Sequence, residues 1–161
     1  MSYEAVGLGN AIMDALVRVD DSIIEELGLH RGRMHPVDHH AWHAAYERVH
    51  AFGVEVHSGG SCANTIQTAG LLGARVLYCG QIGDDAFGEM YARSMLDVCG
   101  VHALKTTTNH VTGKCLSLIS TRDGERTMLT DLGAAVHLPT DRKSTRLNSS
   151  HSSVSRMPSS A

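Results

Sequence analysis

The sequence lacks a charge excess, a long apolar run and a leader-like start, and each absence removes a class of function. With 14 Lys and Arg against 17 Asp and Glu, the formal net charge is −3, so we expect no nucleic-acid or membrane-binding surface. No apolar run approaches the ~20 residues that cross a bilayer. The first residues carry no basic region followed by a continuous apolar stretch, so we expect a cytoplasmic protein.

Paired cysteines are also missing. The four cysteines are widely spaced and form no CxxC pair, which argues against a zinc knuckle or a redox pair. We expect all of them to be reduced, buried thiols, and they are Cys62, Cys79, Cys99 and Cys115.

Histidine is abundant by contrast, and HPVDHHAWHAAYERVH puts His39 and His43 four residues apart on a predicted helix. Two imidazoles at this spacing could share a metal, which is an alternative interpretation. The glutamate that makes HExxH a hydrolytic site is absent. An apolar stripe on the same helix predicts that the histidines face water and that the chain holds no metal. The stripe consists of Trp42, Ala45, Tyr46 and Val49.

Strand-like and helix-like segments alternate along the chain, which predicts an α/β fold built from parallel βαβ units. One short helix is predicted from a capping box of Ser22 and Glu25 to Gly28. Longer helices are predicted over residues 38–50, 61–72 and 84–98, the last capped by Asp84 or Asp85 with an apolar face of Phe87, Met90, Tyr91 and Val98. Strands are predicted over residues 6–9, 54–57 and 75–79, and further strand-like runs cover residues 15–19, 34–37 and 114–121.

The stretch HSGGSCANTIQTAGLLGARVLYCGQIGDDAFG places a glycine pair and an asparagine where a short strand enters a helix. Gly59 and Gly60 lack a Cβ, so the backbone can adopt positive φ and approach a ligand closely. Ser61 is the predicted cap of the helix. Asn64 lies one turn into the helix, and its amide can both donate to and accept from a sugar hydroxyl. The junction therefore predicts a binding site for a polar small molecule.

These residues resemble the N-terminal signature of the PfkB, or ribokinase-like, family of sugar and nucleoside kinases. The resemblance rests on the glycine pair, on Asn64, on Gly73 at the end of the helix and on Gly83, which opens GDDAFG, and it runs from about residue 6 to about residue 138. Cys62 and Ile66 stand where the signature usually carries smaller residues. The resemblance implies the N-terminal part of a three-layer αβα sandwich with a small β lid.

Upstream, VGLGNAIMDALVRV resembles the family's first strand and the start of its lid, with Asn10 and Asp14 at positions that contact the substrate sugar. A carboxylate has two acceptor oxygens spaced for two neighbouring hydroxyls, so Asp14 suits a vicinal diol. Dinucleotide binding is the alternative, because Gly7 and Gly9 begin a GxG motif. The final glycine of that motif would fall at Ile12, where none stands.

Downstream, VTGKCLSLISTRDGERTMLTDLGAAV resembles the adenosine-kinase-like branch of the same family. Asp123 and Gly124 between two strand-like runs predict a hairpin with a type I′ turn, in which both central residues have positive φ. In nucleoside kinases a basic residue at the place of Arg126 can face the transferred phosphate. Arg126 is therefore a candidate phosphate contact, with a solvated surface arginine as the alternative.

The chain changes character after residue 140. The segment DRKSTRLNSSHSSVSRMPSSA is rich in serine and has no apolar period, which predicts a disordered tail over residues 141–161. Residues 141–151 match the translation of a widely used sequencing-library adapter letter for letter, and residues 155–161 match its outer part. We therefore expect a non-native tail after an N-terminal kinase part of residues 1–140.

The resemblance implies an enzyme that moves the γ-phosphate of ATP, with magnesium, to a hydroxymethyl group of a small-molecule sugar or nucleoside. The implied acceptor contacts are Asn10, Asp14, Gly59, Gly60 and Asn64. The family's anion hole, catalytic base and most of its nucleotide pocket lie in a half that is absent here. We therefore expect an inactive fragment without catalytic or nucleotide-binding residues of its own.

Adenosine or a related ribose-containing compound is the favoured acceptor, while ribose, fructose derivatives and other nucleosides stay open. A non-catalytic sugar-binding module is the alternative function, and an NAD-binding Rossmann protein is a more remote one. The sequence leaves the oligomeric state open.

Overall fold

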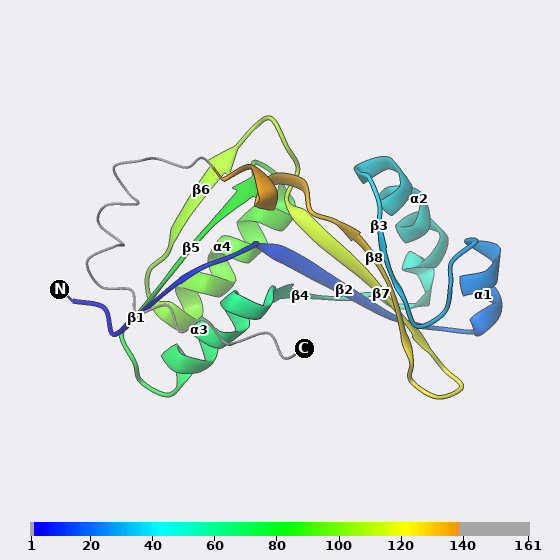
Figure 1. Ribbon diagram of the computed structural model, residues 1–161, viewed down its shortest axis with the longest axis horizontal. Coiled ribbons are helices and arrows are strands. Elements are labelled where there is room, and N and C mark those ends of the chain that lie inside the picture. The colour runs from blue at the N-terminus through cyan, green and yellow to red at the C-terminus, as the bar shows by residue number, and fades with distance from the viewer. Residues whose placement is uncertain (1, 139–161) are drawn as a thin grey trace, which may run out of the picture.

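The structure is a computed structural model that describes residues 2–138. The predicted boundary at residue 140 and the predicted non-native tail over residues 141–161 lie outside the described residues and stay predictions. Figure 1 shows two sheets placed along the long axis of the molecule, each with two helices. The helices are α1 (Asp21–Glu26), α2 (His39–Val49), α3 (Ser61–Leu71) and α4 (Ala86–Cys99), with short 3-10 turns at η1 (His50–Phe52) and η2 (Gly133–His137).

The first sheet, which we call the core sheet, is three-stranded and parallel in the order β1-β5-β6. Its strands are β1 (Ala5–Leu8), β5 (Val76–Gly83) and β6 (Ala103–Thr107). Helices α3 and α4 pack against it, and Tyr78, Tyr91 and Met95 are fully buried between them. The parallel order confirms the predicted α/β fold, although β6 was not among the predicted strands.

The second sheet, which we call the lid sheet, is five-stranded in the order β3-β8-β7-β2-β4. Its strands are β2 (Ile12–Val19), β3 (Met34–Pro36), β4 (Glu55–Gly59), β7 (Gly113–Ser120) and β8 (Arg126–Asp131). All three strand-like runs predicted for the lid lie in this sheet. Alternate residues of β2 turn their apolar side chains toward α1 and α2, where they pack with Trp42, Val49 and Leu118. The predicted stripe of α2 is thereby confirmed.

One prediction about connections was wrong, and one alternative lacks its structural context. Strand β4 is not part of a parallel βαβ unit, because it pairs antiparallel with β2 in the lid sheet and the chain then crosses to the core sheet through α3. The GxG of Gly7 and Gly9 does not open a helix, because β1 leads directly into β2. A dinucleotide motif needs a helix N-terminus at that point, so its structural context is missing.

The helix starts also correct the sequence analysis. Helix α1 is capped by Asp20, whose carboxylate accepts from the Ser22 N–H, so the Ser22–Glu25 capping box was wrong. Helix α3 is preceded by Gly60 at the cap position, and Ser61 is its first helical residue rather than its cap. Asp85, not Asp84, caps α4. Met90 of α4 is exposed, because the buried face runs through Tyr91 and Met95.

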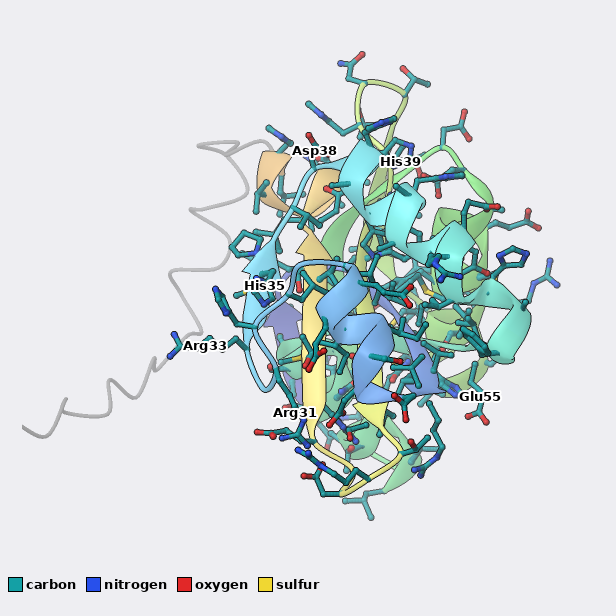
Figure 2. The ribbon with its side chains drawn as sticks, turned by 90° about the vertical axis from the view of Figure 1, so that its right-hand side faces the viewer. Arg31, Arg33, His35, Asp38, His39 and Glu55 are labelled. Carbon is teal, nitrogen blue, oxygen red and sulfur yellow. The ribbon has the colours of Figure 1, made fainter. Side chains whose placement is uncertain are left out.

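The hairpin between β7 and β8 is confirmed, but its turn is not type I′. Gly124 has a φ of +79°, whereas no residue other than glycine has positive φ within residues 2–138, so Asp123 keeps an ordinary backbone. Arg31 forms ion pairs with Asp123 and Glu125 at this turn and with Asp21 at 3.3 Å. Figure 2 shows Arg31 beside the turn and α2 starting at Asp38 and His39.

Candidate functional site

The predicted site residues come from two chain junctions that meet at one end of the β2–β4 pair. Ile12, the first residue of β2, pairs with Gly59, the last residue of β4. The segment before β2 and the segment after β4 are therefore adjacent, although about 50 residues separate them in the sequence. Asn10 and Gly60 lie in these two segments.

The side chain of Asp14 lies directly against Gly59. A Cβ added to Gly59 would overlap the carboxylate of Asp14. Gly59 has no positive φ. A side chain at this position would therefore conflict with the approach of the Asp14 carboxylate and not with the backbone conformation. Positive φ was predicted for this glycine pair, and it is observed for Gly60 but not for Gly59.

Gly60 makes the sharp bend between β4 and α3. Its φ of +97° is strained for any residue with a side chain, and a Cβ there would lie 2.5 Å from the carbonyl oxygen of Asn10. The helix starts at the next residue, and the N–H of Asn64 donates to the Gly60 carbonyl at 2.9 Å. The bend thus carries the chain from the lid sheet into a helix of the core.

The carboxylate of Asp14 is half-buried and has no hydrogen-bond donor among residues 2–138. Burial raises the pKa of Asp14, and the nearby Arg126 and His57 offset part of that rise. A carboxylate in this position is poorly solvated and has free acceptor oxygens. Hydroxyl donors from a ligand would stabilise its charged form.

Asn64 contacts the glycine bend through its backbone N–H, which donates to the Gly60 carbonyl. Its side chain is exposed and lines an open hollow of about 430 Å³ along α3, together with Thr65, Thr68, Ala69 and Leu72. No hydrogen bond joins the Asn64 side chain to Asp14 in the described part of the chain. The structure therefore brings Asp14, Gly59, Gly60 and Asn10 into contact, while the amide of Asn64 lies on the outer side of α3.

Arg126 is the first residue of β8 and is exposed. It lies on the lid sheet near enough to Asp14 for its charge to lower the pKa of that carboxyl. None of the ion pairs among residues 2–138 involves Arg126. Its guanidinium is therefore free to meet an anion, which suits a phosphoryl oxygen.

Two groups of polar contacts were missed by the sequence analysis, one at the Gly59 end of the site and one on the helix-covered face of the lid sheet. The hydroxyl of Tyr91 donates to the Gly59 carbonyl at 3.0 Å, although Tyr91 was expected only as an apolar residue of α4. The ammonium of Lys114, whose side chain is 4% exposed, lies 3.2 Å from Asp131 and 5.1 Å from the centre of the Trp42 ring. The sequence did contain a signal for the Lys114–Asp131 pair, because the predicted hairpin has a lysine near its start and an aspartate near its end.

Metal-binding clusters and membrane-spanning helices are both absent from residues 2–138. Among residues 2–138, no group of three or more His, Cys, Asp or Glu side chains is arranged to hold a metal ion. Within the same range, none of the helices is both long and apolar enough to cross a bilayer. The four cysteines are unpaired, and Cys115 is buried while the other three are partly exposed, so the prediction that all four are buried was wrong.

Comparisons with known proteins agree on one family. The model of the pfkB family carbohydrate kinases matches residues 34–152. No curated protein gives a significant match.

Solved structures with a similar fold include kinases. An adenosine kinase from Sinorhizobium meliloti is 35% identical with a TM-score of 0.73, over 86% of this chain and 42% of that chain. A probable sugar kinase from Rhizobium etli CFN 42 is 28% identical with a TM-score of 0.72, over 84% of this chain and 41% of that chain. An adenosine kinase from Trypanosoma brucei brucei is 25% identical with a TM-score of 0.73, over 91% of this chain and 46% of that chain. The chain therefore spans less than half the length of these proteins and has their ribokinase-like fold.

Proposed function

Because the chain belongs to the PfkB family of carbohydrate kinases, we propose that it is the acceptor-binding part of a kinase that phosphorylates a hydroxymethyl group of a ribose-containing nucleoside. Adenosine is the favoured acceptor, since the S. meliloti relative at 35% identity is an adenosine kinase. The single observation that carries the proposal is the half-buried, donor-free carboxylate of Asp14 held against Gly59.

The arrangement suits a vicinal diol. The carboxylate of Asp14 offers two acceptor oxygens, and charged acceptors make stronger hydrogen bonds than neutral ones. Gly59 and Gly60 present bare backbone beside it, so a sugar ring can approach without meeting a side chain. In this proposal Asn10 and Asn64 assist from the two junctions, with Asn64 reaching the acceptor by a side-chain rotation or a shift of α3.

The phosphate donor is assigned to ATP with magnesium, which supplies the transferable phosphoryl group when bound. Arg126 fits a phosphoryl oxygen, because it is an exposed cation near Asp14 and forms no ion pair within residues 2–138. Among residues 2–138 no side-chain cluster fits the magnesium ion. We therefore assign most of the nucleotide site and the catalytic base to the remaining length of a full kinase, and we expect the 161-residue chain alone to show no turnover.

Binding to the chain itself tests the proposal. Saturation-transfer NMR should show contact with the ribose protons of adenosine and a weaker contact with 2′-deoxyadenosine, which lacks half of the diol. Asp14→Asn removes a charged acceptor, so affinity should fall about ten- to hundredfold. The matched control is Asp97→Asn, an exposed aspartate on α4. Equal adenosine binding by Asp14→Asn and the unaltered chain would contradict the proposal.

A non-catalytic sugar-binding module is the second candidate, because the Asp14–Gly59 contact suits a sugar diol while no group of side chains among residues 2–138 fits a metal ion. Sequencing the genomic locus past Thr140 separates the two. A frame that continues into a glycine-rich GxGD-type motif supports the kinase, whereas a stop codon near that point supports the module. ATP-dependent phosphorylation of adenosine by the purified chain would show that the expected lack of turnover is wrong.

A further inference from the structure

Helix α4 contacts the glycine bend from the buried side of the acceptor site. Tyr91 is fully buried, and its hydroxyl donates to the carbonyl oxygen of Gly59 at 3.0 Å. Burial raises the pKa of Tyr91, and the neighbouring Tyr78 raises it further. The hydroxyl therefore keeps its proton at physiological pH and remains a hydrogen-bond donor.

A second contact lies one residue earlier on β4 and one turn later on α4. The hydroxyls of Ser58 and Ser94 are 2.7 Å apart. The side-chain amide of Gln67, from α3, donates to both hydroxyls at 3.3 and 3.2 Å. These contacts tie the end of β4 to both core helices through a part-buried polar cluster.

The bend needs these hydrogen bonds because it consists of two glycines. Two consecutive glycines permit the close approach of Asp14 and Asn10, but they also give this part of the chain more conformational freedom than any other residue pair. The β2–β4 ladder ends at the Ile12–Gly59 pair, so the ladder does not continue past the bend. Tyr91 and Ser94 supply contacts from outside the ladder at this point.

We propose that Tyr91 and Ser94 are positioning residues. They hold the Gly59–Gly60 bend in the position in which its backbone and the Asp14 carboxylate can contact the same acceptor. The proposal rests on the acceptor site described above. It assigns a role in sugar binding to two side chains that contact no acceptor themselves. Tyr91 acts through the Gly59 carbonyl, and Ser94 acts through Ser58.

Tyr91→Phe tests the role with an isosteric change in the full chain. Amide hydrogen exchange at Gly59 and Gly60 should accelerate about two- to tenfold, which corresponds to the loss of one hydrogen bond. The NMR titration midpoint of the Asp14 carboxyl should shift, and adenosine affinity should fall by a similar factor. The matched control is Tyr46→Phe, which removes the hydroxyl of a partly buried tyrosine on α2 that packs in the lid cluster and stacks on Trp42 at a ring distance of 5.1 Å. It should leave the Gly59–Gly60 exchange and the Asp14 titration unchanged.

Ser94→Ala gives an independent test of the second tether, with the same direction and a smaller effect. Unchanged glycine exchange and an unchanged Asp14 titration in both Tyr91→Phe and Ser94→Ala would overturn the proposal. Equal changes in Tyr91→Phe and Tyr46→Phe would also overturn it, because they would indicate general loosening of the fold. A chain that binds no nucleoside would count against the proposed function, and the exchange and titration results would still decide the positioning role.

Discussion

The lid and the core sheet differ in how completely they bury their own apolar surface. The lid sheet packs against α1 and α2 and encloses a cluster that includes Trp42, Val49 and Leu118. The core sheet carries α3 and α4 on one face, while Val6 and Leu8 of β1 are 51% and 61% exposed on the other. Among the described residues, the lid is thus a closed two-layer unit, whereas the core sheet shows two layers of a three-layer sandwich.

This difference indicates where the proposed acceptor site draws its stability. Asp14 belongs to the closed lid, whereas Asn64 and Tyr91 belong to helices of the half-covered core. Gly59 and Gly60 form one of the covalent links between the two regions, which are also joined between β1 and β2 and between β6 and β7. The lid should therefore be the rigid side of the site, and the core helices the side whose position is more easily altered.

Truncation of the lid core tests the comparison with the largest expected effect. Trp42 is 3% exposed, stacks on Tyr46 at 5.1 Å and meets the edge of Phe87 at 6.1 Å. Trp42→Ala should lower the free energy of unfolding by about 3–5 kcal/mol, as for other buried aromatic residues. Leu8→Ala, on the open face of the core sheet, should change it by less than ~0.5 kcal/mol. Urea denaturation followed by circular dichroism measures both, and equal losses would contradict the contrast.

The hydrogen-bonded junction of Asp85 and Thr112, between the start of α4 and the start of β7, should give the next largest effect. The Asp85 carboxylate accepts from the Gly88 N–H at 2.8 Å and from the Thr112 N–H and hydroxyl at 2.7 Å each. The Thr112 hydroxyl in turn accepts from the Gly83 N–H at 2.9 Å. Asp85→Ala should therefore cost about 2 kcal/mol of unfolding free energy, since buried donors lose their partner. The exposed Asp84→Ala is the control and should be nearly neutral.

The same carboxylate predicts a pH dependence. Burial of Asp85 opposes its charge, but hydrogen bonds from Thr112 and Gly88 and the nearby Lys114 outweigh burial and lower its pKa below 3.8. A lowered folded-state pKa means that the stabilisation is present above the unfolded-state pKa and is lost as the pH falls through the folded-state pKa. Denaturation midpoints from pH 5 to pH 2 should therefore fall less steeply in Asp85→Ala than in the unaltered chain. Parallel curves would show that this interpretation of Asp85 is wrong.

Much of this architecture could be predicted from local patterns. The apolar stripe of α2 and the glycines that follow α3 and α4 are short-range signals, and those helices lie close to where they were expected. The sheet to which β4 belongs could not be predicted, because a strand's alternation does not specify its partner. The grouping of Asp14 with Gly59 followed from the family resemblance. The role of the Tyr91 hydroxyl could not be predicted, since its partner lies 32 residues away in sequence.

A smaller effect is expected at the far tip of the lid. Arg31 pairs with Asp21, Asp123 and Glu125, which connects α1 to the β7–β8 turn. Arg31→Ala should lower the melting temperature slightly at low salt, and the difference should disappear near 1 M salt because exposed ion pairs are screened. The control is Arg93→Ala, which breaks one exposed pair with Glu89 on α4. A salt-independent loss in Arg31→Ala would point to packing of its side chain instead.

The smallest expected effect has the opposite sign. Burial raises the pKa of Asp14, with Arg126 and His57 offsetting part of the rise, so the fold disfavours its ionised form. A raised folded-state pKa contributes stability below the unfolded-state pKa and loses that contribution as the pH rises through the folded-state pKa. Asp14→Asn should therefore be slightly more stable than the unaltered chain at pH 7, and this advantage should vanish near pH 3. A variant that gains stability while losing adenosine affinity would show that the lid, although closed and well packed, retains one charged group for its ligand and not for its fold. Equal stability losses at both pH values would show that Asp14 is instead a structural residue of the lid.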